Sequence, residues 1–284
     1  MILLDFSGIA IAPVVMGKVG SNDENLIRHM ILNSIRMYKQ KFKSYGDMVI
    51  VADAGGNWRK DVYPEYKGKR KKTRDASTID WDVAFSHINM VLDEIKTNMP
   101  WKVIHQWGCE ADDAIAEITK WTQDFGNYED VMIVSSDHDF IQLQKFNNVK
   151  QFSPTTKKFV TNENPRLFQA DHILRGCTGD GVPNVLSDDD TFITEGKRQN
   201  VLSKKKKESL MADPHALGET VYRNFLRNKK MIVLTEESEC PDVVKKDIIN
   251  KFEEQETTSK RSKVLPYLIS KQCRLLVEVV EEFL

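Results

Sequence analysis

Three short apolar segments, each ending close to an aspartate, constrain the fold of this 284-residue chain most strongly. They are MILLDF at 1–6, MVIVAD at 48–53 and VMIV at 131–134, and the last continues as SSDHDF. Unbroken apolar runs of this length are typical of strands buried on both faces of a parallel sheet. Apolar residues at helical spacing lie between them. The sequence therefore predicts an α/β fold, with a central, mostly parallel sheet flanked by helices and a helical C-terminal region.

The aspartates at the ends of these segments are candidates for a site. Ligands of open α/β sheets bind outside the carboxyl ends of the strands, so Asp5, Asp53 and Asp137 are expected to lie near one another. Asp137 could instead serve as the cap of a following helix. Asp139 is harder to explain in that way, because two carboxylates so close in the chain repel one another unless a cation lies between them.

Two later segments add further acids. In CEADDAIAEITKW (109–121), Glu110 and Asp112 fall on the borders of the buried stripe of a predicted helix, whereas Asp113 points away from it and is expected at the surface. Acids in a first helical turn could also be there only because of the helix dipole. The turn-rich segment GCTGDGVPNV (176–185) contributes Asp180.

So many carboxylates cannot share one cleft in the ionised state without cations. A site of oxygen ligands without nearby Cys or His pairs selects Mg²⁺ or Mn²⁺ over zinc, and His138 is expected to pack rather than to bind the metal. Two such ions would hold the attacking and leaving oxygens of a phosphoryl transfer. The predicted ligands are Asp5, Asp53, Glu110, Asp112, Asp137, Asp139 and Asp180.

A basic segment follows directly after Asp53 and the two glycines behind it. Residues 59–74 hold eight Lys or Arg and two acids, with Trp58, Tyr63 and Tyr66 interleaved. Cations neutralise phosphates and aromatic faces stack on bases, so the segment is predicted to contact a nucleic acid. The alternative is a solvated, flexible charged loop.

The overall composition adds little to what the motifs predict about fold and function. The net charge of −1 conceals the separate basic and acidic clusters. The four cysteines have no zinc-like spacing and are expected to be reduced thiols of a cytosolic protein. Neither a signal peptide nor a membrane span is expected. A boundary is predicted near residue 185, between a catalytic body (1–185) and a mostly helical region (186–284).

Four motifs, PEYKGKR, GCEADDAIA, SSDHDF and TGDGVPNV, resemble the 5′ nuclease (flap endonuclease) family over residues 2–185. Length and the N-terminal half are most similar to its T-even phage branch. The resemblance implies a PIN-like fold and a 5′–3′ exonuclease and flap endonuclease with ribonuclease H activity, which removes RNA primers in lagging-strand replication. It implies two Mg²⁺ ions, with Mn²⁺ as a substitute.

The resemblance also implies roles for single residues. Asp53, Asp112 and Asp137 correspond to ligands of the first metal, with Asp5 in its outer shell, and Asp139, Asp180 and Glu110 to the group at the second. Lys67 and Arg70 match catalytic residues of the basic arch, while Arg59 and Tyr66 are expected to bind substrate. Expected partners are DNA and RNA–DNA hybrids with 5′ ends or flaps, a single-stranded DNA-binding protein and a sliding clamp. A monomer in the host cytoplasm is expected, with the 186–284 region on duplex DNA.

Two departures from the family pattern leave alternatives open. Pro183 stands where a second aspartate is usual, and Asp188, Asp189 or Asp190 could fill that gap. The helical hairpin that binds duplex in the family is not recognisable in LSDDDTFITEGKRQ (186–199). The chain could therefore be a nucleic-acid-binding protein of the same fold with little catalysis. A small single-strand ribonuclease lacks the arch motif, and a haloacid-dehalogenase-type phosphatase would need an aspartate where Ser7 stands.

Overall fold

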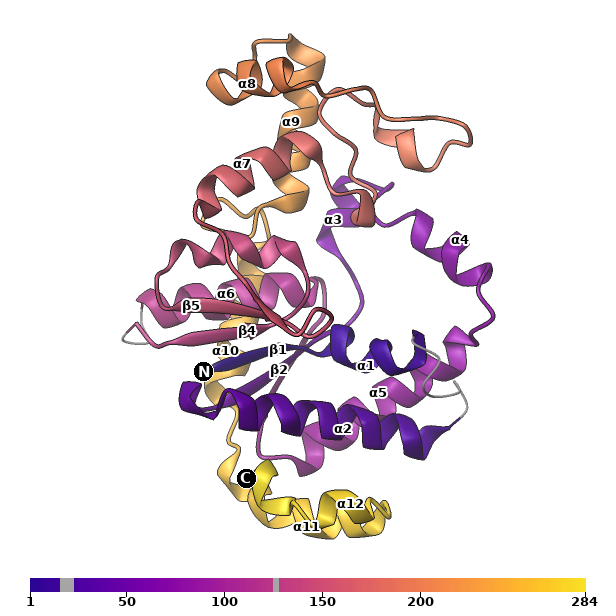
Figure 1. Cartoon of the computed structure of the whole chain (residues 1–284), viewed down its shortest axis with the longest axis vertical. Coiled ribbons are helices and arrows are strands. Elements are labelled where there is room, and N and C mark those ends of the chain that lie inside the picture. The colour runs from indigo at the N-terminus through magenta and orange to yellow at the C-terminus, as the bar shows by residue number, and fades with distance from the viewer. Residues whose placement is uncertain (16–22, 125–127) are drawn as a thin grey trace.

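The computed structural model describes residues 1–15, 23–124 and 128–284, and its centre is one sheet (Figure 1). The strand order is β3-β2-β1-β4-β5-β6, and every neighbouring pair is parallel except β5 and β6. The strands are β1 (Ile2–Asp5), β2 (Met48–Asp53), β3 (Lys102–Gln106), β4 (Val131–Val134), β5 (Val149–Ser153) and β6 (Lys158–Val160). This arrangement confirms the predicted mostly parallel sheet.

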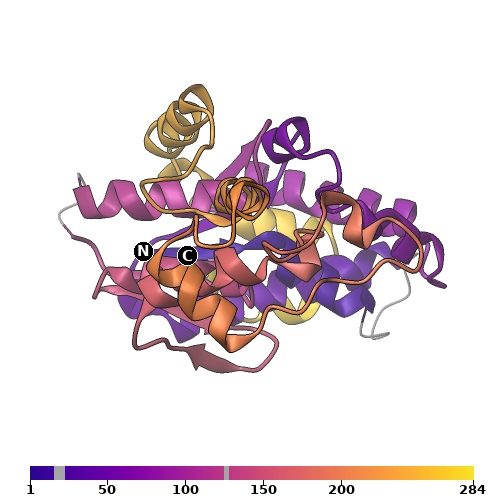
Figure 2. The same cartoon turned by 90° about the horizontal axis from the view of Figure 1, so that it is seen from above.

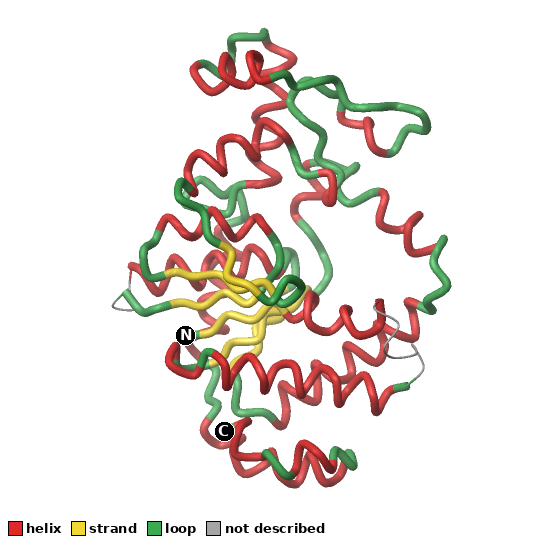
Figure 3. Tube along the Cα trace, viewed as in Figure 1, coloured by secondary structure: helices red, strands yellow, loops and turns green. Residues whose placement is uncertain are grey.

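The central strands are buried on both faces, as their apolar runs predict. Successive side chains of a strand point to opposite faces, and here they enter two separate cores. Ile2 and Leu4 pack into one core, whereas Leu3 packs into the other. All three are fully buried. Helices cover both faces, and Figure 3 shows the strands as one layer between them.

The helices that cover the first face are α1 (Phe6–Val15), α2 (Glu24–Lys41) and α5 (Trp81–Asn98). The helix α1 begins directly after β1. The side chain of Asp23 caps α2 by accepting from Leu26 N.

The opposite face carries α6 (Ala111–Asp124) and α10 (Asp242–Glu254), which pack on each other and on β3. Between them in the chain come α7 (Pro165–Arg175), α8 (Lys204–Ala212) and α9 (Glu219–Ile232), which lie nearest the viewer in Figure 2. The C-terminal segment forms α11 (Arg261–Ser270), α12 (Arg274–Val277) and the 3₁₀ turn η6 (Val280–Phe283).

Residues on both sides of position 185 share these two cores. Ile248 and Phe252 pack into the core under β1 and β2 from one face, and Leu268 and Phe283 pack into the core on the other face. The C-terminal region is mostly helical, as predicted, and it is integrated with the sheet. None of the described helices is long and apolar enough to cross a membrane.

A separate feature projects from β2. Two short helices, α3 (Trp58–Val62) and α4 (Lys69–Asp75), lead away from the sheet and return to the start of α5. In Figure 1, α4 lies across from the carboxyl ends of the strands. We call residues 58–75 the arch segment.

Candidate active site

Three carboxylates lie at the edge where β1, β2 and β4 end. These strands are parallel neighbours, so their carboxyl ends lie on one side of the sheet. Ser135 Oγ, just after β4, donates to Asp5 Oδ2 at 2.8 Å, and Ser7 Oγ, just after β1, donates to Asp53 Oδ2 at 3.0 Å. Burial raises the pKa of Asp5 to about 6, and the charge of Asp53 adds to the rise. The register of the sheet therefore brings the predicted strand-end acids together.

The first turn of α6 joins the same cluster. Ala111 N donates to Asp53 Oδ1 at 2.8 Å, which ties the start of α6 to the end of β2. Burial raises the pKa of Asp112 well above its usual range, and the charge of Asp137 raises it further. Asp112 thus faces the strand ends, as its position on the border of the buried stripe predicts.

Asp137 and Asp139 follow β4 and begin the 3₁₀ helix η2 (His138–Lys145). Asp137 Oδ1 accepts from Asp139 N at 2.9 Å, so the capping interpretation of Asp137 is confirmed. Burial raises the pKa of both carboxyls. Asp139 is 7% exposed, and its Oδ1 has no hydrogen-bond partner although His172 Nδ1 lies 3.2 Å away. A buried carboxylate oxygen without a partner is costly unless a cation or a donor satisfies it.

Asp180 is held beside Glu110 by the arch segment. Arg70 donates to Asp180 Oδ1 at 2.8 Å, and Lys67 Nζ lies 3.4 Å from the same oxygen and bonds to Glu110. Tyr66 Oη donates to Glu110 Oε2 at 2.7 Å. Burial alone would raise the pKa of Glu110, but the charges of Lys67 and Arg59 lower it more. The predicted arch cations therefore lie directly against two of the predicted metal-site acids.

The backbone of the arch segment is also tied to this corner. Lys67 N donates to the carbonyl oxygen of Asp180 at 2.7 Å. Lys67 has a φ of 57°, a conformation that costs free energy for residues other than glycine. Gly176, at φ 72°, begins the turn that carries Asp180, and a Cβ there would lie 2.3 Å from the carbonyl oxygen of Val182. The arch segment and the turn that carries Asp180 thus each contain a residue with a positive φ.

The structure corrects two predictions about the start of the arch segment. Asp113 is buried rather than at the surface, and Arg59 is 2% exposed, so it cannot reach a phosphate. Arg59 Nη1 and Nη2 donate to the two Asp113 carboxylate oxygens at 2.6 and 2.9 Å, and its Nε donates to the carbonyl oxygen of Met231. This pair joins α3 to α6 and α9. The helical pattern around Asp113 could not reveal it, because the partner comes from another segment.

The aromatic residues of the arch segment are also not available for stacking. Trp58, Tyr63 and Tyr66 are buried, so the prediction that they stack on bases is wrong. The Tyr66 hydroxyl instead contacts Glu110, and the Tyr63 hydroxyl donates to the carbonyl oxygen of Asp189. In the second half of the segment every residue from 68 to 75 is exposed, whereas the first half alternates between exposed residues, such as Lys60, and these buried rings.

A pocket of about 370 Å³ lies between the strand ends and the arch segment. It joins acids from the sheet side to cations from the arch side, which is the charge pattern that suits a phosphate beside metal ions. Its lining residues are Asp53, Gly55, Gly56, Asn57, Lys60, Lys67, Arg70, Arg74, Cys109 and Glu110.

The donor set of this corner fits a hard divalent cation. Burial raises the pKa values of Asp5, Asp112 and Asp139, and the charges of neighbouring carboxylates raise them further. Asp139 also offers an oxygen without a hydrogen-bond partner. Carboxylate oxygens are the protein ligands of Mg²⁺. As the described side chains stand, no three His, Cys, Asp or Glu are already gathered around one ion position, and Lys67 and Arg70 neutralise Glu110 and Asp180 instead.

Pro183, which stands where the family usually has a second aspartate, packs inside the protein. Pro183 is buried, and its carbonyl oxygen accepts from Arg227 and Asn228 of α9. The acids after it are held by other cations: Lys197 pairs with Asp188 and Asp190, and Asp189 pairs with Arg223 and Arg227. These pairings favour a second metal site with one acid fewer than is usual in the family. They speak against the alternative in which an acid of residues 188–190 takes the place of the missing aspartate.

Sequence reasoning did not single out some residues that this corner uses. Ser7 and Ser135 orient the strand-end acids through hydrogen bonds, and their place one or two residues from a strand end is the signal that was available. His172, from α7, is the buried residue that faces Asp139. No local pattern in the sequence marks it.

With this geometry in place, the similarity to known proteins can be interpreted. Residues 16–171 match the family described as the 5′–3′ exonuclease, N-terminal resolvase-like domain, and residues 165–283 match the family described as T4 RNase H, C terminal. The ribonuclease H of Enterobacteria phage T4 is 32% identical over 295 aligned positions, which cover 99% of this chain and 95% of that protein. The likeness thus continues past Val185, where the motifs alone show little.

Solved structures agree with the fold. A phage T5 protein crystallised with metal ions has a TM-score of 0.65 and 18% identity, covering 88% of this chain and 98% of that one. A phage T5 flap endonuclease in a complex with DNA and metal ions has the same TM-score and identity, covering 89% and 99%. The chain belongs to the 5′–3′ exonuclease family, with a C-terminal region of the T4 RNase H type. It is a nuclease of PIN-like fold.

Proposed function

We propose that this protein hydrolyses phosphodiesters at the 5′ ends of RNA–DNA hybrids, duplex DNA and 5′ flaps, using two Mg²⁺ ions for which Mn²⁺ can substitute. The observation that carries the proposal is that acids and arch cations face each other across one pocket. We call the acids at the strand ends and beside them the carboxylate corner: Asp5, Asp53, Glu110, Asp112, Asp137, Asp139 and Asp180. The names of the relatives, a ribonuclease H and a flap endonuclease, support the same class of substrate.

Each group of residues has a distinct task in this proposal. Asp53, Asp112 and Asp137, with Asp5 behind them, hold the first ion. Glu110, Asp139 and Asp180 serve the second. When bound, the ions supply a nucleophile from water and neutralise the charge that develops on the scissile phosphate.

The arch cations act on the substrate rather than on the metal. In the described structure Lys67 and Arg70 neutralise Glu110 and Asp180. Both cations line the pocket, where they would contact a phosphate oxygen, position the scissile phosphate and offset its charge. Tyr66 and the Arg59–Asp113 pair hold the arch segment in place without touching the substrate.

The proposed biological substrates are those of a nuclease that acts at 5′ ends. Removal of RNA primers and short flaps in lagging-strand replication requires a nuclease that recognises a 5′ end. We assign catalysis to residues 1–185 and contact with duplex DNA to residues 186–284, whose exposed lysines at 204–206 suit phosphates. A monomer in the host cytoplasm, working beside a single-stranded DNA-binding protein and a sliding clamp, fits this role.

A direct assay uses a 5′-labelled flap and an RNA–DNA hybrid, each with Mg²⁺ or with EDTA. Cleavage of both in Mg²⁺ and of neither in EDTA is expected. The second candidate, a nucleic-acid-binding protein of the same fold with little catalysis, is favoured by Pro183, because a buried proline supplies no carboxylate at the position where the family usually has a second aspartate. Tight binding of both substrates without cleavage at any Mg²⁺ concentration would select that candidate.

A further inference from the structure

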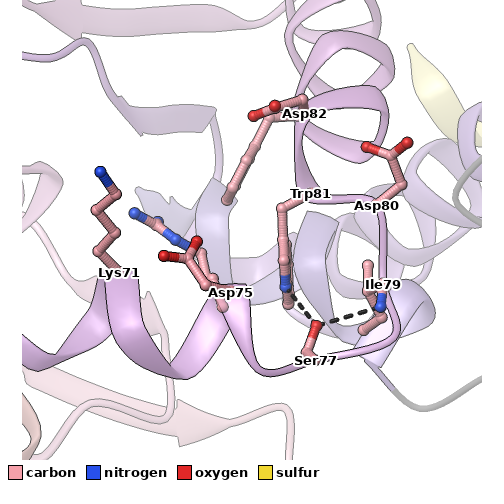
Figure 4. A pocket seen from close by; sticks show the side chains of 9 residues that line it. Lys71, Asp75, Ser77, Ile79, Asp80, Trp81 and Asp82 are labelled. Carbon is pink, nitrogen blue, oxygen red and sulfur yellow. Dashed lines mark hydrogen bonds between the residues drawn. The ribbon is translucent and has the colours of Figure 1, made fainter.

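A second pocket, of about 500 Å³, lies at the far end of the arch segment from the strand ends. It is formed where α4 ends and α5 begins (Figure 4). Its lining residues are Lys71, Arg74, Asp75, Ser77, Ile79, Asp80, Trp81, Asp82 and Phe85. In Figure 4, Lys71 and Asp75 form one wall, and Trp81 and Asp82 face them from the other. The function proposed above does not use this pocket.

The two pockets adjoin along α4. Arg74 lines both of them, and Arg70 and Lys71 line one each. Residues three or four apart lie on one face of a helix, one turn or about 5.4 Å along its axis. Arg70, Lys71 and Arg74 therefore form a continuous cationic edge that leads from the carboxylate corner to the second pocket, and a strand of phosphates can follow such an edge.

The aromatic wall of this pocket, Trp81 and Phe85, is held in place by contacts within the protein. Trp81 Nε1 donates to Ser77 Oγ at 2.8 Å, and Ile79 N donates to the same oxygen, so the indole is held by its edge. The Trp81 and Phe85 rings have centroids 5.5 Å apart at an interplanar angle of 30°. Phe85 packs on the core below, and the Arg74 guanidinium lies 5.8 Å from its centroid. A ring fixed in this way stacks on a base at little entropic cost.

The acids of the pocket decide which part of a nucleotide enters it. Asp80 caps α5 through Val83 N, whereas Asp75 and Asp82 are exposed in the walls. Carboxylates repel a phosphate, but they accept hydrogen bonds from the exocyclic amino groups of adenine, cytosine and guanine. The base therefore belongs inside the pocket, and the phosphate outside it on Lys71 and Arg74.

We propose that this pocket binds one nucleotide of the single-stranded 5′ segment after it has passed the carboxylate corner, with its base stacked on Trp81 and Phe85. The inference rests on the proposed function, because it needs a substrate whose 5′ strand extends beyond the scissile phosphate. Bases with an exocyclic amino group are preferred to thymine.

Equilibrium binding tests this without cleavage. Fluorescence anisotropy in EDTA compares duplexes whose single-stranded 5′ segment grows from nothing one nucleotide at a time. The affinity of the wild type is expected to rise by about tenfold at the length that reaches the pocket. Trp81→Ala should abolish this step and leave the affinity for the blunt duplex unchanged. Trp81→Phe should retain most of it. Tyr128→Ala is a matched control, because Tyr128 is an aromatic residue that is 77% exposed and lies just before the amino end of β4, whereas the site lies at the carboxyl ends of the strands.

Two outcomes would contradict the proposal that this pocket binds a nucleotide. One is a step of the same size in Trp81→Ala; the other is an equal loss of affinity for every duplex, blunt ones included. Cytidine segments should bind more tightly than thymidine segments in the wild type, and this preference should vanish in Trp81→Ala. Cleavage in Mg²⁺ is recorded separately, so an inactive wild type would count against the proposed function, while the pocket is judged by the binding step alone.

Discussion

The carboxylate corner and the arch segment lie on opposite sides of one pocket and are built in opposite ways. The acids follow buried parallel strands, and serines and backbone amides orient them. The basic residues of the arch segment lie on two short helices and in the turn between them, and of these Arg70 is exposed while Arg59 is buried. Similar residues in one basic segment thus have different tasks: Arg59 supports the structure, whereas Lys67 and Arg70 face the site.

Neutralising one carboxylate should have the largest effect. Asp137→Asn and Asp139→Asn are each expected to abolish Mg²⁺-dependent cleavage, because the corner loses a metal ligand. Substrate binding should stay the same or become tighter, since affinity comes from cations on phosphates. Single-turnover cleavage and anisotropy measure the two quantities. Turnover at the wild-type rate would remove these residues from the site.

Removing the buried member of the arch segment should cost stability. Arg59→Met leaves Asp113 buried without its partner, so the free energy of unfolding should fall by about 3–5 kcal/mol. Urea unfolding of the metal-free protein measures this change. Lys60→Met is the control, because Lys60 is the exposed neighbour of Arg59, and it should change the stability by less than about 0.5 kcal/mol. Equal losses in the two variants would contradict the difference drawn between buried and exposed basic residues.

Removing the cations that face the site should cost rate instead. Lys67→Ala and Arg70→Ala should each slow cleavage by about a hundredfold, because a positioning group is lost, while the affinity for duplex changes little. Cleavage rates are compared at saturating enzyme. If saturation restores the full rate, Lys67 and Arg70 only bind phosphates and do not position the scissile one.

The smallest effect is expected at Pro183. With one acid fewer near Asp180, more Mg²⁺ is needed, so Pro183→Asp should lower the Mg²⁺ concentration for half-maximal rate by a few-fold. Neutralising Asp188 and Asp190 should leave that midpoint unchanged, because both are paired with Lys197. A Mg²⁺ titration of the variants gives the answer. A large rise of the midpoint after neutralisation would show that these downstream acids serve the metal.

The same contrast explains what the sequence could predict. Asp5, Asp53 and Asp137 follow apolar runs whose parallel pairing fixes where they end, so local pattern was enough to bring them together. Arg59 and Asp113 lie 54 positions apart in the chain, and no periodicity connects them. His172 reaches Asp139 only through the packing of α7 on η2. The C-terminal helices were predicted, but not their share in both cores.

The central claim is that the strand-end carboxylates are held together for a divalent cation, at a cost to the metal-free fold. Burial raises the pKa of Asp5 from 3.8 to about 6. Because the folded-state pKa is raised, its ionisation lowers stability as the pH rises from about 4 through 6. Other carboxyls of the corner, Asp112 and Asp139, are shifted in the same direction.

The most direct measurement is therefore the free energy of unfolding at pH 7.5, with EDTA and with Mg²⁺, for the wild type and Asp137→Asn. Mg²⁺ should stabilise the wild type markedly and Asp137→Asn much less. In EDTA, Asp137→Asn should be more stable than the wild type by about 1 kcal/mol, since it removes a repelling charge. If Mg²⁺ stabilises neither protein, and the substitution destabilises the metal-free fold, the carboxylate corner is not a metal site.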